Sequence, residues 1–431
     1  MTLMITSFNR IFRNDMVAFV NVLSVLIFFS SCGTSQKLSN ENLSSQFLYA
    51  DEMLSPEVVV HHFSDDSSRV YFKIPSGKLL FISNGDKYLA RLQVKYVFYS
   101  DYNSVQPIDT GMKLYEVVSS QNNVGLESFF DTKIISGSNI VLKITFNDVQ
   151  RNAEAARYLN IRKPEGMSSQ DFLIRNSDKV PLYRNFFSAP CELNVASGRY
   201  LTDSLWVRCY FRDFPIAVLP FRVIEDPVFA MASDSSFRIS SDKLMSFKIS
   251  EPGIYFLQND TSAFHGLALL GFERGYPKVT HSDEMIEATR YLTTRREYQQ
   301  LIQSADKKAA LDQFWLDVGG NYERARNLIR AYYNRVQDAN HLFTSYTDGW
   351  KTDRGMIHMV FGKPQSVYRD GETEQWSYTN VPGFPDILFV FRKMNNPFTD
   401  NDYALIRQSV YENVWYIAVD QWRQGRIVND D

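Results

Sequence analysis

The sulfur and imidazole side chains are the first candidates for chemistry, and they are few. The chain has 431 residues with only three cysteines and six histidines. It contains neither a CxxC nor an HExxH sequence, so the spacings typical of zinc sites are absent. We therefore expect no metal and no cofactor.

Cys191 and Cys209 form an even pair once Cys32 is set aside. They bracket a segment in which Gly198 separates two strand-like runs. A hairpin or loop there could bring the two Cα atoms within the roughly 4.4–6.8 Å that a disulfide requires. We predict a disulfide, as is usual in an oxidising compartment. The alternative is two buried free thiols, because cysteine packs well as a small hydrophobe.

Asp353 and His358 suggest a charge relay, in which a carboxylate orients an imidazole. His358, however, falls within Met356–Val360, where the residues alternate as in an ordinary strand. A partly buried packing histidine is the better interpretation. We predict no catalytic residue in the chain.

The short GWKTDR sequence around Trp350 reads as a turn held by its own side chains. Gly349 follows a predicted helix end and is expected to take a positive φ. Thr352 and Asp353 carry short oxygens suited to neighbouring backbone N–H groups, and Arg354 offers a fork to a carboxylate. Trp350 adds a large apolar face. We interpret the turn as structural, holding helix to sheet; the alternatives are a binding surface and a catalytic centre.

The N-terminus predicts export. Arg10 and Arg13 precede an apolar run from Met16 to Phe29 that ends in small residues. The run is shorter than the ~20 apolar residues of a membrane-spanning helix. We predict a signal peptide over residues 1–31.

Cys32 directly follows Ser30 and Ser31, and this ending resembles the lipobox of bacterial lipoproteins. The resemblance implies cleavage before Cys32 and its lipidation with palmitate-type acyl chains. Each buried CH₂ contributes ~0.8 kcal/mol, so several chains would anchor the protein stably in a membrane. The alternative is an ordinary secretory signal with an unmodified thiol.

The segment 32–45 is polar and has no apolar period, so we predict a flexible tether. Some lipoproteins reach the cell surface through an acidic cluster directly after the lipidated cysteine. Here only Glu41 is acidic. We therefore expect an outer-membrane lipoprotein whose body faces the periplasm.

Composition excludes several protein classes. With 44% hydrophobic and 22% charged residues, the chain is neither disordered nor a multi-span membrane protein. Its net charge of -3 indicates no excess of basic residues that would bind a phosphate backbone, so nucleic acid is not an expected partner. The aromatic content of 14% favours strands. At ~100–200 residues per domain, we expect two or three domains.

Two β-rich regions precede residue 282. Runs that alternate like half-buried strands predict an antiparallel β-sandwich-like domain over 46–163. After a turn-rich break, a second such domain is predicted over 167–280. The expected strands are Val58–His62, Arg69–Ile74, Lys78–Ile82, Tyr88–Tyr99, Met112–Val118 and Ile140–Phe146, then Leu205–Phe211, Ile216–Val223, Ser236–Ser240, Lys243–Ile249 and Gly253–Leu257. A Pro-Gly turn at Pro252 feeds the last strand, a construction common in sandwich domains that bind partners.

Near Ser282 the spacing of hydrophobic residues changes from the two-residue period of a strand to the 3.6-residue period of a helix. This change predicts a third domain over 282–431. Thr294 and Glu297 form a capping box for a helix. Further helices are predicted at Asp306–Val318 and Tyr322–Phe343, and a small antiparallel meander follows. The longest helix carries an apolar seam of Ala325, Ile329, Tyr332, Val336, Ala339 and Phe343.

This third region resembles the GWxTD-domain family of bacterial envelope proteins. The resemblance covers about residues 282–426. It rests on the GWKTDR sequence together with Phe314-Trp315, Phe361-Gly362-Lys363-Pro364 and Trp376-Ser377-Tyr378. It implies an exported domain, commonly carried after β-domains, with no established activity to transfer.

We therefore expect a mixed β and α+β fold: two antiparallel β-sandwich-like domains followed by a C-terminal α+β domain. The functional hypothesis is a lipid-anchored binding or scaffold component of an envelope protein complex, with an unidentified envelope protein as partner and no turnover of its own. The alternative is a cell-wall or peptide hydrolase that uses the GWxTD domain.

Overall fold

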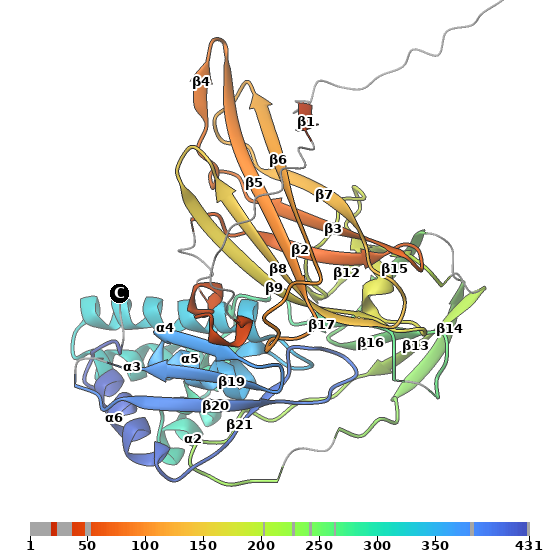
Figure 1. Ribbon diagram of the computed structural model, residues 1–431. Helices are drawn as coiled ribbons and strands as arrows, with labels where there is room; N and C mark the ends of the chain where they lie inside the picture. The colour runs from red at the N-terminus through yellow and green to blue at the C-terminus, as the bar shows by residue number, and fades with distance from the viewer. Residues whose placement is uncertain are drawn as a thin grey trace, which may run out of the picture.

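The computed structural model confirms the mixed β and α+β fold class (Figure 1). It describes residues 37–47, 53–200, 203–225, 229–240, 244–262, 264–379 and 383–428, together with the backbone of residues 19–23. Two β-rich domains come first along the chain. The helices and a small sheet form a third domain, at the lower left of Figure 1.

Two antiparallel sheets enclose the core of the first domain. The larger has the order β1-β6-β5-β8-β9, with β4 on β5, and the smaller has the order β2-β3-β7. In β3, half-buried and buried residues alternate, so Val70, Phe72 and Ile74 face the core. The strands are β1 (Phe19–Leu23), β2 (Glu57–His62), β3 (Ser67–Ile74), β4 (Ile82–Asn84), β5 (Lys87–Tyr99), β6 (Asp109–Ser119), β7 (Leu126–Lys133), β8 (Ser138–Asp148) and β9 (Ala153–Lys163).

The sequence prediction for this domain was wrong at one strand and missed two others. Lys78–Ile82 is not a strand, because the Leu80 N–H bonds the Asp148 carboxylate at 2.8 Å in place of a neighbouring strand. Strands β7 and β9 were not predicted. The alanines, glutamate and arginines of β9 favour helix, and pairing along β8 overrides that preference.

Strand β1 falls inside the predicted signal peptide. Its backbone pairs antiparallel with β6, with Phe19 opposite Val118 and Leu23 opposite Leu114. The rest of residues 1–31 and the predicted lipidation site Cys32 lie outside the described residues.

The second domain also contains two sheets. Their orders are β10-β12-β15 and β11-β17-β16-β13-β14, and all described pairs are antiparallel except that between β11 and β17. A short 3-10 helix, η3 (Ser169–Asp171), leads into it from β9. The strands are β10 (Phe172–Arg175), β11 (Phe186–Ser188), β12 (Cys191–Ser197), β13 (Ser204–Tyr210), β14 (Ser235–Ser240), β15 (Leu244–Ile249), β16 (Gly253–Gln258) and β17 (Leu267–Phe272).

The predicted strand Ile216–Val223 is wrong. Pro215 and Pro220 cannot donate to a ladder, and the described residues 211–225 contain no strand. We call them the crossing segment, because they leave β13 and run over the third domain. There the Ala217 N–H bonds the Lys351 carbonyl at 2.8 Å.

The predicted disulfide is not formed, and Cys191 and Cys209 are free thiols. The prediction assumed a hairpin between them, but β12 and β13 belong to different sheets. Cys191 stands opposite Ile249, whereas Cys209 stands opposite Tyr255. Burial raises the pKa of both thiols. Of the alternative of two buried free thiols, Cys209 is buried, whereas Cys191 is only half-buried.

The third domain combines six α-helices with a four-stranded antiparallel meander of order β18-β19-β20-β21 among the residues described. The capping box is confirmed, because the Thr294 hydroxyl accepts the Glu297 N–H and the Glu297 carboxylate accepts the Thr294 N–H. The helices are α1 (Ser282–Ala288), α2 (Arg295–Gln303), α3 (Lys307–Gly319), α4 (Tyr322–Phe343), α5 (Asp353–Phe361) and α6 (Tyr411–Arg423); the strands are β18 (Ser366–Arg369), β19 (Thr373–Tyr378), β20 (Ile387–Lys393) and β21 (Tyr403–Leu405).

Helix α5 corrects the prediction of a strand at Met356–Val360. Every residue from Arg354 to Phe361 is buried, so the helix has no polar face and no 3.6-residue period to recognise. Helix α4 has the predicted bounds, and of its predicted seam only Ile329 is less than fully buried.

Residues 37–47, which we call the N-terminal strap, include residues 37–45 of the tether predicted over 32–45, and this part has a defined structure. They form two short 3-10 helices, η1 (Leu38–Asn40) and η2 (Ser44–Phe47). Leu38 is buried against the first domain, and Leu43 and Phe47 are buried in the core of the third. The strap therefore joins two domains that are far apart in sequence, close to α4 in Figure 1.

Candidate functional site

The GWxTD signature, residues 349–354, lies at the junction of α4 and α5. Its first three residues form a 3-10 helix, η5 (Gly349–Lys351). Gly349 does not have the positive φ that we predicted. It is required for a different reason, since a Cβ there would lie 2.0 Å from the Ala339 carbonyl oxygen of α4. At Gly355 a Cβ would lie 1.9 Å from the Gly349 carbonyl oxygen, so the two glycines let the backbones approach closely.

Trp350 anchors this junction. Its side chain is 2% exposed and meets the edge of the Tyr291 ring. The Trp350 N–H donates to the Asn340 side chain at 3.1 Å, and the Tyr291 hydroxyl donates to the Trp350 carbonyl at 3.1 Å. Both the ring and the backbone of Trp350 are therefore committed to internal contacts.

Thr352 and Asp353 begin α5, but only one of them bonds neighbouring backbone as predicted. The Thr352 hydroxyl donates to the Gly349 carbonyl at 2.7 Å and accepts the Gly355 N–H at 3.0 Å, which caps the helix. The Asp353 carboxylate instead reaches across the domain. It accepts the Leu405 N–H at 2.7 Å and pairs with the Arg407 guanidinium at 2.5 Å.

The Arg354 guanidinium pairs with a carboxylate, as we predicted from the sequence. Its Nη1 lies 3.3 Å from Oε1 of Glu374, and Nη2 donates to the Asn401 carbonyl at 2.8 Å. Glu374 also accepts hydrogen bonds from Arg369 and Trp376. Burial alone would raise the pKa of Glu374, but the charges of Arg369 and Arg354 outweigh it and lower the pKa.

His358 makes no charge relay with Asp353. Both ring nitrogens of His358 lack a hydrogen-bond partner among the described residues. Burial lowers the pKa of His358 to about 3, so the imidazole is neutral. It packs edge-on against the Phe343 ring, with 5.5 Å between the ring centroids. The interpretation as a packing histidine fits these contacts.

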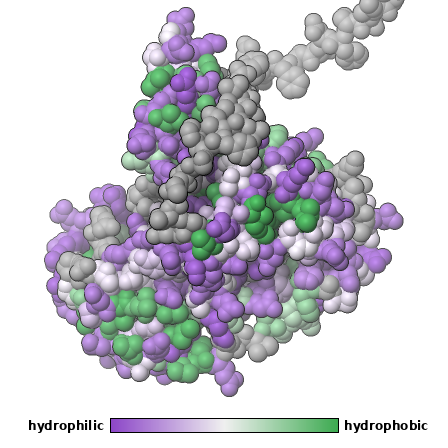
Figure 2. All heavy atoms as spheres, in the orientation of Figure 1, coloured by the Kyte–Doolittle hydropathy of each residue, from purple (hydrophilic) through white to green (hydrophobic). Residues whose placement is uncertain are grey.

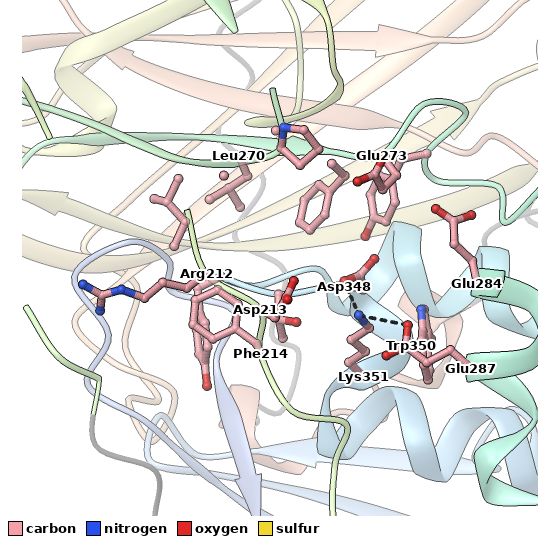
Figure 3. Close-up of a pocket in the computed structure, with 18 of the residues that line it drawn as sticks. Arg212, Asp213, Phe214, Leu270, Glu273, Glu284, Glu287, Asp348, Trp350 and Lys351 are labelled. Carbon is pink, nitrogen blue, oxygen red and sulfur yellow. Dashed lines mark ion pairs between the residues drawn. The ribbon is translucent and has the colours of Figure 1, made fainter. Parts of the chain in front are cut away.

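A pocket of about 360 Å³ opens beside the signature, between the second and third domains (Figure 3). We call it the signature pocket. Its lining comes from the crossing segment, the strands β16 and β17, the turn before α1, α1 itself and the α4–η5 junction. The lining residues lie within 211–214, 252–254, 270–273, 276–287 and 346–351.

Aromatic rings form much of the wall. Phe272 stacks on Tyr276 with 4.1 Å between ring centroids, and Phe214 meets Tyr346 edge-on at 4.7 Å. The Tyr276 hydroxyl accepts the Gly349 N–H at 3.3 Å. The pocket wall is therefore bonded directly to the signature.

Charged groups complete the pocket, and carboxylates outnumber cations. The Lys351 ammonium lies 3.2 Å from Glu287 and 3.4 Å from Asp348, the two ion pairs drawn in Figure 3. Burial alone would lower the pKa of Lys351, but these two carboxylates raise it. Burial raises the pKa of Glu284. Asp213 and Glu273 are exposed at the rim.

One further cluster has side chains of the kind used in hydrolases, at the contact between the first two domains. The Ser68 hydroxyl lies 2.8 Å from Nδ1 of His62 and 3.3 Å from Nζ of Lys163. Burial lowers the pKa of His62 to about 4 and that of Lys163 to about 8. All three residues have 0% exposure, so a substrate has no access to the hydroxyl.

Within the described ranges, no group of three or more His, Cys, Asp or Glu side chains is placed to hold a metal ion. None of the helices in those ranges has the length and apolarity that crossing a membrane requires.

Comparison with known families identifies the third domain. Residues 253–424 match the GWxTD domain, and this part of the chain belongs to the GWxTD-domain family. No curated protein matches the chain. The match begins at β16 rather than at Ser282, the boundary predicted from the helical period. Strands β16 and β17 contact the third domain, since their outer residues pack with Phe398 and Tyr346.

Sequence reasoning found the signature but not the pocket. Of the lining, the sequence singled out the Pro252 turn and Trp350 of the signature. Part of the crossing segment was predicted as the strand Ile216–Val223, and the sequence analysis did not single out Glu284 or Glu287. No local pattern predicts that these segments meet.

Proposed function

We propose that this chain is a lipid-anchored binding or scaffold component of an envelope protein complex, and that the signature pocket is where its GWxTD domain contacts a partner. The proposal rests on the difference between the signature, whose side chains hold the domain together, and the pocket, which is open to solvent. Trp350 and Arg354 of the signature are buried and engaged in internal contacts. The pocket, which Trp350 and Lys351 also line, presents aromatic walls and the exposed carboxylates of Asp213 and Glu273. A pocket built on a rigid junction is suited to recognition.

The N-terminal strap supports anchoring of the body close to a membrane. If Cys32 carries lipid, six residues lead from it to Leu38, which is buried in the first domain. At ~3.5 Å per residue these six residues reach about 20 Å at most. We infer that the domains sit near the membrane, on the periplasmic side of the outer membrane.

Exposed apolar side chains on the third domain also support a binding role. Figure 2 shows apolar residues gathered on its visible face, in the region of β20 and α6. Leu388 is 46% exposed and Tyr416 is 54% exposed. Exposed apolar patches mark sites of protein interaction.

The hydrolase alternative has less support. The one Ser-His-Lys cluster in the described part of the chain is closed to substrate. The two described thiols have raised pKa values, which suits packing and not nucleophilic attack. We therefore place the function in binding.

Site-specific photo-crosslinking in cells tests the binding role. A photoreactive amino acid replaces Lys278, an exposed residue of the pocket rim, and in a matched chain it replaces Tyr322, which is 76% exposed at the start of α4. We expect a discrete adduct from position 278 and none from position 322. Equal adducts from both positions, or none from either, would contradict the proposal.

The anchor needs a separate test. Metabolic labelling with a palmitate analogue should tag the wild-type chain and leave Cys32→Ala unlabelled. Equal labelling of the two chains would exclude lipidation at Cys32.

A further inference from the structure

We propose that the signature pocket receives the cationic side chain of a lysine or arginine presented by a partner protein. This inference rests on the proposed function and names the chemistry that the same pocket recognises. It follows from the size of the pocket, the charges that face it and the rings that form its wall.

The size of the pocket limits the ligand. Pockets for small molecules span about 300–1,000 Å³, and this one, at about 360 Å³, lies at the lower end. A single long side chain with part of its backbone fits such a volume, whereas a nucleotide-sized cofactor would fill it completely. The expected ligand is therefore one or two side chains of a larger partner.

The balance of charge selects a cation. Five carboxylates and three basic side chains line the pocket. Two of the basic groups are already engaged: Lys351 lies between Asp348 and Glu287, and Arg212 donates to the Ala230 carbonyl. Lys278 is the third, at the exposed rim.

Three of the five carboxylates in the pocket have no strong ion pair to neutralise their negative charge. Asp213 and Glu273 make no side-chain ion pair or hydrogen bond among the described residues, and Glu284 has only His281 as an ion-pair contact, at 3.9 Å. The backbone N–H groups of Thr280 and His281 also bond Glu284, but burial outweighs these bonds and raises its pKa. An arriving ammonium or guanidinium group supplies a charged partner.

The aromatic wall favours the same ligand. A cation is attracted to the face of an aromatic ring within about 6 Å. The chain already uses this contact beside the pocket, where the Lys351 ammonium lies 5.4 Å from the Trp350 ring and the Arg212 guanidinium lies 5.4 Å from the Phe229 ring. Rings with nearby carboxylates can hold both the stem and the charged end of a lysine or arginine.

Calorimetric titration of the full-length chain in detergent tests the proposal at low salt. The probe is the blocked tripeptide acetyl-Gly-Lys-Gly-amide, compared with the same peptide acetylated on the lysine amine. An arginine peptide and free cadaverine complete the set. We expect the lysine and arginine peptides to bind about tenfold more tightly than the acetylated peptide, and raised salt to weaken them.

Substitution of two pocket carboxylates tests whether the lysine peptide binds in this pocket. Glu284→Gln and Asp213→Asn should each weaken the lysine peptide several-fold with no change in melting temperature. The matched control is Glu323→Gln, at an exposed position on α4, and it should bind as wild type does.

Several results would overturn the proposal. They are equal affinity for the charged and acetylated peptides, no binding of any probe, or full affinity in both pocket variants. Tighter binding of cadaverine than of the peptide would make the ligand a free amine and not a protein side chain. If the adduct from position 278 survives in Glu284→Gln while no peptide binds, the cation proposal fails and the binding role stands.

Discussion

Arg354 and Glu374 form an ion pair that is closed to solvent, with side chains 2% and 0% exposed and 3.3 Å between Nη1 and Oε1. The pair joins α5, where the signature continues, to the centre of the C-terminal sheet. Glu374 is also bonded by Arg369 and Trp376. The last residue of the signature is therefore part of a buried network and not of an exposed site.

Removing the charge of Glu374 should destabilise the domain strongly. Glu374→Gln leaves two buried guanidinium groups uncompensated, and breaking a buried pair in this way costs about 3–5 kcal/mol. Urea unfolding followed by tryptophan fluorescence measures the loss. Five of the six tryptophans lie in the third domain, at 315, 350, 376, 415 and 422.

The matched control is Lys308→Ala, which breaks an ion pair whose side chains are 75% and 52% exposed. It should leave the urea midpoint of unfolding almost unchanged, because solvent screens an exposed ion pair. Equal unfolding midpoints for the two variants would show that the Arg354–Glu374 network has no stabilising role.

A methyl group at Gly355 should be poorly tolerated. Gly355→Ala places a Cβ 1.9 Å from the Gly349 carbonyl oxygen, so the junction of η5 and α5 must move apart. We expect a loss of about 3 kcal/mol or more. Gly166→Ala is the control, because a Cβ there meets nothing within 4 Å. Thermal melting compares the two, and a normal melting temperature for Gly355→Ala would contradict the close approach.

Local signals in the sequence predicted the parts of the fold that depend on neighbouring residues. The capping box of Thr294 and Glu297 is such a signal, as is the seam that placed α4 at its observed bounds. Helix α5 was mistaken for a strand because it is buried on every side. Residues 37–45 of the strap were mistaken for a tether because their buried residues, Leu38 and Leu43, follow no helical or strand period.

The pocket could not be predicted, because its parts are distant in the sequence. Phe214 meets Tyr346, and Tyr276 meets Gly349, only after the second and third domains have packed together. The sequence carries the signature as a motif, since its residues are consecutive and the turn is closed by the bonds of Thr352 to Gly349 and Gly355. It carries no comparable motif for groups that meet across a domain boundary.

The buried His358 should make the domain sensitive to acid. Its pKa is about 3 in the folded chain, against about 6.5 when unfolded. Between these two values the unfolded chain binds a proton that the folded chain excludes. The free energy of unfolding therefore falls as the pH decreases from about 6.5 towards 3, by at most ~1.4 kcal/mol per pH unit from this residue.

His358→Leu should remove this part of the pH dependence. At pH 7 it should leave stability unchanged or raise it, because two unpartnered ring nitrogens disappear from the core. Urea unfolding from pH 7 to pH 4 is the measurement, with the exposed His265→Leu as control. A steeper acid loss in His358→Leu than in wild type would contradict the account.

Phe47 directly follows the segment predicted as a tether, and we expect it to be as important for stability as a core residue. Its ring lies 5.2 Å from Trp376 and 5.7 Å from Phe343, centroid to centroid. Phe47→Ala should cost about 3 kcal/mol and release the strap to limited proteolysis. Phe264→Ala, at a residue 49% exposed, should do neither. Wild-type stability of Phe47→Ala would contradict the packing of Phe47 in the core of the third domain.

Thiol counting distinguishes the structure from the sequence prediction at Cys191 and Cys209. In the Cys32→Ala chain, denatured without reductant, two thiols should react with a maleimide reagent, because both cysteines are free. A chain in which neither thiol reacts until reductant is added would establish the disulfide instead.

The central claim is that the signature holds the domain together while the carboxylates of the pocket beside it bind a cationic side chain of a partner. The most direct test measures the photo-crosslinked adduct from position 278 in the double variant Asp213→Asn, Glu284→Gln, together with its melting temperature. The account predicts that the adduct is lost and the melting temperature stays within about 2 °C of wild type, as expected when stability changes by less than about 0.5 kcal/mol. An undiminished adduct in a fully folded double variant would contradict it.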